Sequence, residues 1–152
     1  IRLGGNTMHK MNDTPRMLSI IGSVFDFLGV FGIAITAYVF KAVFNEKFFE
    51  GIVSPEEMSE IQGIVELYQV IGNVMIVFAM LLTVIFVINL IVNIRLIQGK
   101  VTEEQSRTYY TYQLFIGIVL LLINTISGIV YIVSGIKGRD NEPDRVTTRE
   151  GI

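Results

Sequence analysis

Residues 17–40 read MLSIIGSVFDFLGVFGIAITAYVF, an apolar run in which Asp26 is the single charged residue. Two further apolar runs carry no charge: VIGNVMIVFAMLLTVIFVINLIVNI over residues 70–94 and YQLFIGIVLLLINTISGIVYIVSGI over residues 112–136. A helix needs roughly 20 apolar residues to cross a bilayer, and each run is long enough. The sequence therefore predicts an all-α fold, a membrane-embedded three-helix bundle, with a membrane domain over residues 17–137.

The composition excludes several classes of protein. Of the 152 residues, 51% are hydrophobic, and a mean hydropathy of +0.58 is too high for a water-soluble domain with one buried core. The net charge of −2 offers no extended basic surface for nucleic acid. The absence of cysteine removes disulfides, thiol redox chemistry and thiolate metal sites. The one histidine, His9, is predicted to be solvated in a polar tail, so we expect neither a metal site nor a cofactor.

Residues 1–16 are predicted to form a polar N-terminal tail. Residues 1–7 read IRLGGNT, and two glycine codons shortly before a methionine codon can contain a purine-rich ribosome-binding sequence. One interpretation is a translated leader, with a bacterial source and a true start at Met8 or Met11, and the other is a fragment of a longer protein. The first apolar run exceeds the roughly 7–15 residues of a signal-peptide core, so we expect a retained anchor.

Helix 1 and the polar segments follow from local signals. Thr14 as cap and Pro15 in the first helical position begin the helix, which is expected to end near Phe44. Residues 45–69 are rich in glutamate and are predicted to be an acidic, water-facing loop. Residues 138–152 mix charges without apolar periodicity, so we expect a disordered charged tail.

Two capping boxes set the starts of helices 2 and 3. Residues 54–57 read SPEE, which predicts a helix over residues 55–98 that projects beyond the bilayer. Gly99 is a stop signal, and residues 102–105 read TEEQ, which predicts a third helix over residues 103–137. Because the turn between them is so short, helices 2 and 3 should form a long antiparallel hairpin. An aromatic belt at the headgroups is expected from Tyr109, Tyr110 and Tyr112.

Small and polar residues in the spans predict which helix faces touch, because helices in lipid associate by close approach and by hydrogen bonds. Stripes at alternating three- and four-residue spacing occur in all three runs: Ser19, Gly22, Asp26, Gly29 and Thr36; Gly72, Ala79, Thr83 and Asn93; Gly117, Asn124, Gly128, Tyr131 and Gly135. The intramembrane polar candidates for a functional site are Asp26, Asn73, Asn89, Asn93 and Asn124.

Among these candidates Asp26 is the most informative. A carboxylate in hydrocarbon costs about 2.5–3.5 kcal/mol on insertion scales and by default marks a functional site. Two interpretations stay open. Asp26 is either a structural acid, protonated and hydrogen-bonded to Asn124, Asn73 or Thr83 or shallow enough to meet water, or a group that carries protons or ions. The asparagines are expected to bond between helices. No paired carboxylates occur in a span and no phosphate loop follows a strand, so we predict no catalytic residue and no enzyme.

The distribution of Lys and Arg bears on orientation, because the cytoplasmic side carries the excess. In a three-span topology, counted from Met8 onward, five Lys and Arg residues lie on one side of the membrane and six on the other, so the rule does not determine the orientation. Arg16, Arg95 and Arg107 flank spans closely and favour an N-terminus inside. An alternative topology folds the third run back on itself at Asn124–Gly128, which returns the basic tail to the N-terminal side.

Three parts of the chain resemble, in their order, a family of small uncharacterised (domain-of-unknown-function) integral membrane proteins of Gram-positive bacteria. They are TPRMLSIIGSVFDFLGVFGI at residues 14–33, the acidic loop, and GIVYIVSGIKGR at residues 128–139. The resemblance implies a multi-pass protein of the bacterial cell (plasma) membrane. It implies no activity, substrate or catalytic residue, and a fourth apolar segment usual in the family does not occur in this sequence.

These observations predict a non-enzymatic integral membrane protein, an accessory or envelope-associated factor that acts through helix–helix association. Its expected partners are the lipid bilayer and either another membrane protein or a second copy, and no nucleic acid. The alternative is a small transporter or channel subunit with a polar path around Asp26. Polar stripes that satisfy one another inside one bundle would favour association. Stripes that line a water-filled gap between protomers would favour transport.

Overall fold

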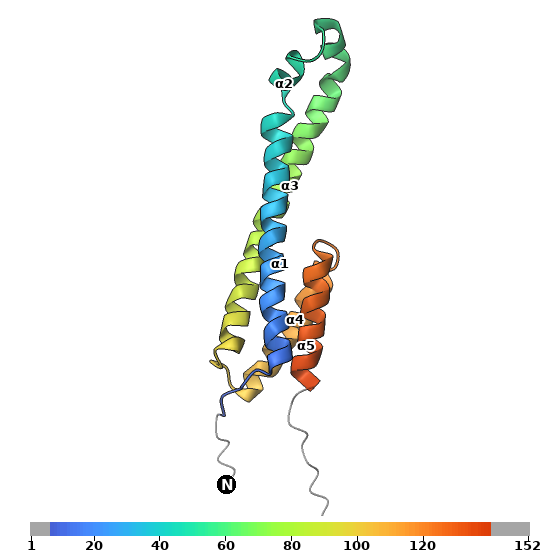
Figure 1. Cartoon of the computed structure of the whole chain (residues 1–152). Helices are drawn as coiled ribbons and strands as arrows, with labels where there is room; N and C mark the ends of the chain where they lie inside the picture. The colour runs from blue at the N-terminus through green and yellow to red at the C-terminus, as the bar shows by residue number, and fades with distance from the viewer. Residues whose placement is uncertain (1–6, 141–152) are drawn as a thin grey trace, which may run out of the picture. The chain divides into compact units, whose positions relative to one another are not determined.

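A computed structural model describes residues 7–140 (Figure 1). This part of the chain is α-helical and contains no strand, which confirms the all-α prediction. Its elements are α1 (Asp13–Tyr38), the π-helical turn η1 (Val39–Val43), α2 (Glu46–Glu50), α3 (Pro55–Ile97), α4 (Glu103–Leu120) and α5 (Thr125–Asp140). The leader proposed at residues 1–7 and the disordered tail predicted at residues 138–152 lie outside the described residues, except for Thr7 and residues 138–140. The prediction is wrong for residues 138–140, which form the end of α5.

The chain divides into two compact units. The two-helix unit is Phe27–Phe86, and the other unit, called here the hairpin unit, has residues 7–26 and 87–140 as its described part. Two helical segments, Asp13–Val43 and Pro55–Ile97, are long and apolar enough to cross a membrane. Each contributes to both units, whereas α4 and α5 belong to the hairpin unit alone.

Both predicted capping boxes are present. At the start of α3, Glu57 Oε2 accepts hydrogen bonds of 2.9 Å from the backbone N–H and from the hydroxyl of Ser54. At the start of α4, Thr102 and Gln105 cap each other's backbone N–H groups reciprocally. The stop before α4 is Gly99, whose φ of 63° lies in the left-handed region that favours glycine. Both helix starts therefore follow from ordinary capping chemistry.

The start of helix 1 was predicted two residues too late. The helix begins at Asp13, and the Arg16 N–H already donates to the Asn12 carbonyl at 3.1 Å, so Thr14 lies inside the first turn and is not the cap. Its end is close to the prediction, because η1 continues the helical path to Val43.

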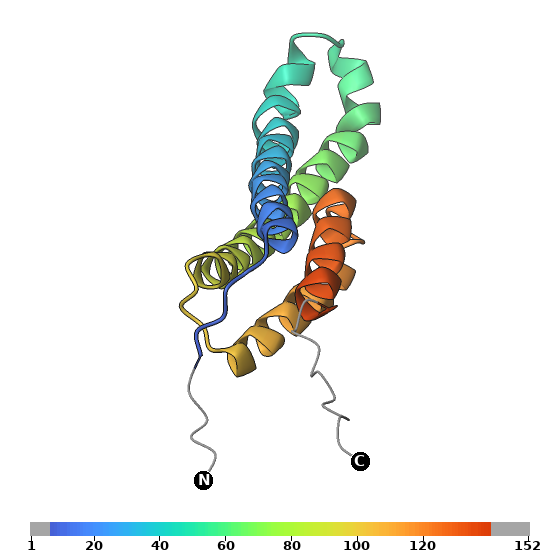
Figure 2. The same ribbon diagram turned by 60° about the horizontal axis from the view of Figure 1, so that its bottom comes forward.

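The single third helix over residues 103–137 is wrong. The chain turns at residues 121–124, and α5 packs back along α4 (Figure 2). Glycine makes this return possible: a Cβ on Gly128 would lie 2.6 Å from the Leu121 nitrogen, and one on Gly117 would lie 2.8 Å from the Gly128 oxygen. Asn124 also begins α5, since its side-chain oxygen accepts from the Ser127 N–H at 3.5 Å. The chain therefore folds back within the third apolar run, as in the alternative, but at residues 121–124 rather than at Asn124–Gly128.

The expected antiparallel pairing of helices 2 and 3 holds at the end of α3. Asn93 and Asn89 of α3 accept hydrogen bonds from Gln113 and Tyr112 of α4, at 2.8 and 2.7 Å. Because α4 ends at Leu120, the hairpin formed by α3 and α4 is shorter than predicted, and the second short hairpin, α4 with α5, takes the place of a third span.

The N-terminal segment is part of the packed hairpin unit. The His9 N–H donates to the Val101 carbonyl at 2.9 Å. The His9 ring then bonds to Glu103 Oε2 at 3.0 Å and to the Tyr110 hydroxyl at 2.8 Å. The side chain of His9 is only 11% exposed, so the prediction of a solvated tail histidine is wrong. Tyr110 is buried as well, which removes it from the expected aromatic belt.

Candidate functional site

The candidate site lies in the hairpin unit and is centred on Asp26. This carboxylate is 5% exposed and accepts hydrogen bonds from three side chains. Its Oδ2 accepts from Asn89 Nδ2 at 2.7 Å and from the Tyr131 hydroxyl at 2.9 Å. Its Oδ1 accepts from the Ser127 hydroxyl. The donors come from α3 and α5, so a single residue of α1 holds both of these helices.

A second polar layer lies one to two helical turns from Asp26. At its centre, Asn93 Nδ2 lies 2.8 Å from Ser23 Oγ, 3.2 Å from the Ser19 carbonyl and 3.1 Å from the Tyr131 hydroxyl. Gln113 donates from Nε2 to Asn93 Oδ1 at 2.8 Å, so α4 joins the same layer. Tyr131 therefore connects the two layers, because its hydroxyl contacts both Asp26 and Asn93.

Serines close the network around Gln113. Its Nε2 donates to Ser19 Oγ at 2.8 Å, and its Oε1 accepts from Ser134 Oγ at 3.0 Å. The two serine hydroxyls lie 3.1 Å apart. Gln113, Ser19 and Ser134 are each 1% exposed or less, so this part of the network is enclosed by protein.

Helical spacing explains why these side chains meet. Ser19 and Asp26 lie seven residues apart on α1, as do Ser127 and Ser134 on α5, so each pair shares one helix face. Gly22, between Ser19 and Asp26, supplies the room: a Cβ at that position would lie 2.8 Å from Tyr131 Cζ. The Tyr131 ring therefore lies directly on the α1 backbone.

Of the five predicted polar candidates, the structure brings three together in one network: Asp26, Asn89 and Asn93. A fourth candidate, Asn124, lies at the edge of this network. Asn89 and Asn93 belong to the network, whereas Asn124 donates to the Phe25 carbonyl at 2.8 Å and does not reach the carboxylate. Asn73 is not part of this site, since it accepts from Lys41 Nζ at 2.7 Å within the two-helix unit.

The expected partners of Asp26 are therefore wrong. Asn124 and Asn73 bond elsewhere, and the Thr83 hydroxyl donates to the carbonyl of Ala79, one turn earlier on its own helix, at 2.7 Å. The physical reason is the fold-back of α5, which carries Ser127 and Tyr131 to α1 in place of the residues expected from a straight third helix.

Sequence reasoning missed five participants: Ser23, Tyr112, Gln113, Ser127 and Ser134. Ser127 and Ser134 share a helix face with Tyr131, which was in the predicted stripe, and this spacing was a usable signal. Gln113 was a second signal, because a glutamine inside an apolar run needs hydrogen-bond partners for both ends of its amide.

The network leaves little unused hydrogen-bonding capacity. Within residues 7–140, every buried side-chain nitrogen and oxygen has a hydrogen-bond partner. The groups that contact Asp26 are neutral donors from an amide and two hydroxyls. Such an arrangement stabilises a fixed packing of four helical segments, since breaking one member leaves others unsatisfied.

Comparisons with protein-family models, with curated proteins and with solved structures found no match to this chain.

Proposed function

We propose that the chain is a non-enzymatic integral protein of the bacterial plasma membrane that acts by helix–helix association, as an accessory or envelope-associated factor. The observation that carries this proposal is the contrast between the buried polar network and the exposed apolar surface of the protein. The polar groups around Asp26 satisfy one another, while large apolar side chains such as Phe31, Phe115 and Leu122 are 57%, 70% and 91% exposed. A surface of this kind suits lipid or another membrane helix.

The proposed topology has two spans and one hairpin that enters the bilayer without crossing it. α4 has 18 residues, or roughly 27 Å at 1.5 Å per residue, and its turn to α5 carries the exposed Leu122. The backbone N–H groups of the turn at residues 121–124 donate to carbonyls of α4, and Asn124 bonds the Phe25 carbonyl, so the turn presents few unpaired polar groups to lipid. The hairpin would thus dip into lipid with its apolar tip foremost.

This topology also removes the ambiguity of orientation. With two spans, the N-terminal segment, the turn between α3 and α4 and the C-terminal tail all lie on one side. From Met8 onward, nine Lys and Arg residues fall on that side and two, Lys41 and Lys47, on the other. The positive-inside rule then places both termini in the cytoplasm and the glutamate-rich loop outside.

Accessibility of single cysteines tests the topology, and the sequence contains no native cysteine to interfere. The exposed positions Glu57, Lys100 and Asp140 are each replaced by cysteine and labelled in intact cells with an impermeant maleimide. We expect labelling at position 57 alone, and labelling of all three after permeabilisation. A cysteine at position 140 that reacts like the one at position 57 would restore a third crossing and refute the hairpin.

A second measurement separates association from transport. Proteoliposomes that contain a pH-sensitive dye and an imposed pH gradient report proton leakage. If Asp26 is structural, the wild-type chain and Asp26→Asn should leak equally. A leak or ion flux that Asp26→Asn abolishes in a folded protein would favour the alternative, a transporter or channel subunit with a polar path around Asp26. Association itself is tested by crosslinking in native membranes, followed by purification and identification of the crosslinked protein.

A further inference from the structure

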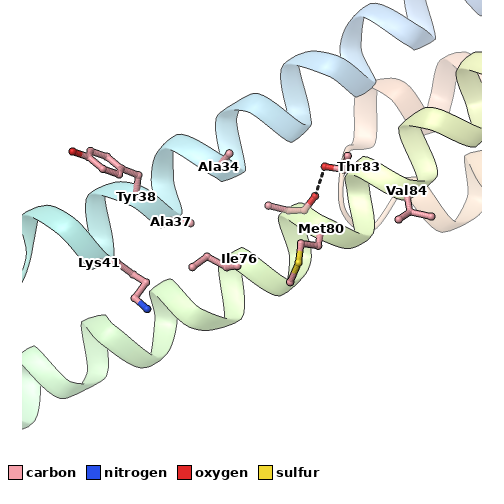
Figure 3. Close-up of a pocket in the computed structure, with 9 residues that line it drawn as sticks. Ala34, Ala37, Tyr38, Lys41, Ile76, Met80, Thr83 and Val84 are labelled. Atoms are coloured by element: carbon pink, nitrogen blue, oxygen red, sulfur yellow. Dashed lines mark hydrogen bonds between the residues drawn. The ribbon is translucent and has the colours of Figure 1, made fainter.

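The two-helix unit contains an apolar groove between α1 and α3 (Figure 3). Its volume is about 740 Å³, within the roughly 300–1,000 Å³ of small-molecule sites. Ala34 and Ala37 of α1 and Ile76 and Met80 of α3 line it. The small alanine side chains leave the space open, and its walls offer almost no hydrogen-bonding group to an occupant.

One end of the groove is polar. Figure 3 shows Lys41 reaching from the helix that carries Tyr38 towards the facing helix α3, while Thr83 and Val84 lie towards the other end. Tyr38 also lines the groove and is 67% exposed. An apolar groove with an amine at one end has the polarity of a lipid molecule, with a hydrocarbon chain on one side and a headgroup on the other.

The position of the Lys41 amine is defined by its packing. Its side-chain stem crosses α3 at Gly72, where a Cβ would lie 2.5 Å from Lys41 Cγ. The ammonium donates to Asn73 Oδ1 at 2.7 Å. Within the described residues no carboxylate forms an ion pair with Lys41, and the side chain that its ammonium contacts is a neutral amide. Lys41 also lies on η1, and π-helical turns occur frequently at functional sites.

We propose that this groove binds an acyl chain of an anionic phospholipid, with the lipid phosphate against Lys41. The inference rests on the proposed function, because it needs α1 and α3 to cross a bilayer. The apolar walls match the acyl chain, and the uncompensated ammonium matches the phosphate. The neighbouring segment 45–69 is acidic and repels anionic lipid in general, so a preference for anionic lipid has to come from a specific site such as this one.

The test uses the full chain in phosphatidylcholine vesicles that contain a small share of a photoactivatable lipid, either phosphatidylglycerol or phosphatidylcholine, with a diazirine in the acyl chain. Crosslinked peptides are mapped by mass spectrometry. We expect attachment at Ile76 or Met80, with a higher yield for phosphatidylglycerol. Lys41→Gln should lower that yield about fivefold, the value of one interfacial lysine. Lys47→Gln removes the same charge from α2, away from the groove, and should leave it unchanged.

Ala34→Leu narrows the groove from an exposed position and should lower crosslinking by both lipids. Equal yields for the two lipids, attachment only elsewhere, or an equal loss with Lys47→Gln would overturn the proposal. So would a disulfide between two copies of a Met80→Cys variant, which would make a second chain the occupant. A wild-type chain that alkaline washing releases from the vesicles refutes the proposed function itself, whereas an integrated chain without lipid preference refutes the lipid site alone.

Discussion

Replacing Asp26 by leucine should destabilise the hairpin unit strongly. Three donors lose their acceptor, and one of them, the Ser127 hydroxyl, has a second acceptor in the Gly22 carbonyl at 3.4 Å. The Tyr131 hydroxyl also contacts the Ser23 hydroxyl, which can accept its hydrogen, whereas the described residues offer the Asn89 amide no second acceptor. At about 1–3 kcal/mol for a buried group left unsatisfied, the free energy of unfolding should fall by about 1–3 kcal/mol.

Asp26→Asn should behave differently, because the site can accommodate an amide. The new side-chain oxygen can accept from Asn89 and Tyr131 in place of Oδ2. The new NH₂ group can donate to Ser127 Oγ, whose hydrogen then turns to the Gly22 carbonyl. No buried group is left without a partner, so we expect a loss of about 1 kcal/mol, from the exchange of charge-assisted for neutral hydrogen bonds.

Unfolding of the detergent-solubilised variants, followed by far-ultraviolet circular dichroism against added denaturing detergent, measures both changes. Val24→Leu serves as the control, because Val24 lies on the same helix and is 52% exposed. Its midpoint should match that of the wild type. The reasoning is refuted if asparagine destabilises the protein as much as leucine does, or if leucine has no effect.

Further predictions concern the turn, the N-terminal segment and the start of α3. Gly128→Leu should prevent α5 from packing on α4, since even a Cβ at Gly128 would lie 2.6 Å from the Leu121 backbone nitrogen. Protease cleavage in the α4–α5 hairpin should therefore rise. The control Gly63→Leu, at an open position of α3, should leave this cleavage unchanged. His9→Ala should release the segment before α1, seen as faster amide exchange at residues 9–12, and unchanged exchange would contradict its anchoring role. Hydrogen bonds from Ser54 lower the pKa of Glu57 below its ordinary 4.5. The cap should therefore be complete above pH 4.5 and weaken as the pH falls through the lowered pKa. Amide exchange in the first turn of α3 should rise on acidification, and Glu57→Gln should remove this pH dependence; Glu57 lies outside the apolar run at residues 70–94, so water reaches it.

The sequence predicted those parts of the structure that depend on local chemistry. The capping boxes at Ser54 and Thr102 and the glycine stop at position 99 each act within one turn, so their signals are contiguous in the chain. The fold-back at residues 121–124 is different, because helix propensity and hydropathy continue unbroken across it. It depends on contacts between residues far apart, such as Ser127 with Asp26, and one sequence does not contain that pairing information.

The site shows the same division. The polar candidates Asn89 and Asn93 were recognisable because an amide within an apolar run is expensive unless it is bonded. Which amide meets which acceptor depends on the rotation of each helix, and the assumed straight helix 3 gave the wrong rotation. Tyr112 illustrates this: expected at a headgroup belt, it instead donates to Asn89 Oδ1 at 2.7 Å.

The order in which a ribosome releases these residues gives the network a time scale. Asp26 leaves the ribosome first, Asn89 follows 63 residues later and Ser127 follows 101 residues later. At about 5–20 residues per second, the carboxylate waits roughly 3–13 s for its first partner and roughly 5–20 s for Ser127. During that interval the first apolar helix carries an unmatched acid. In the proposed membrane topology, the insertion machinery or the lipid headgroups at the membrane surface would hold this acid until the last third of the polypeptide has been made.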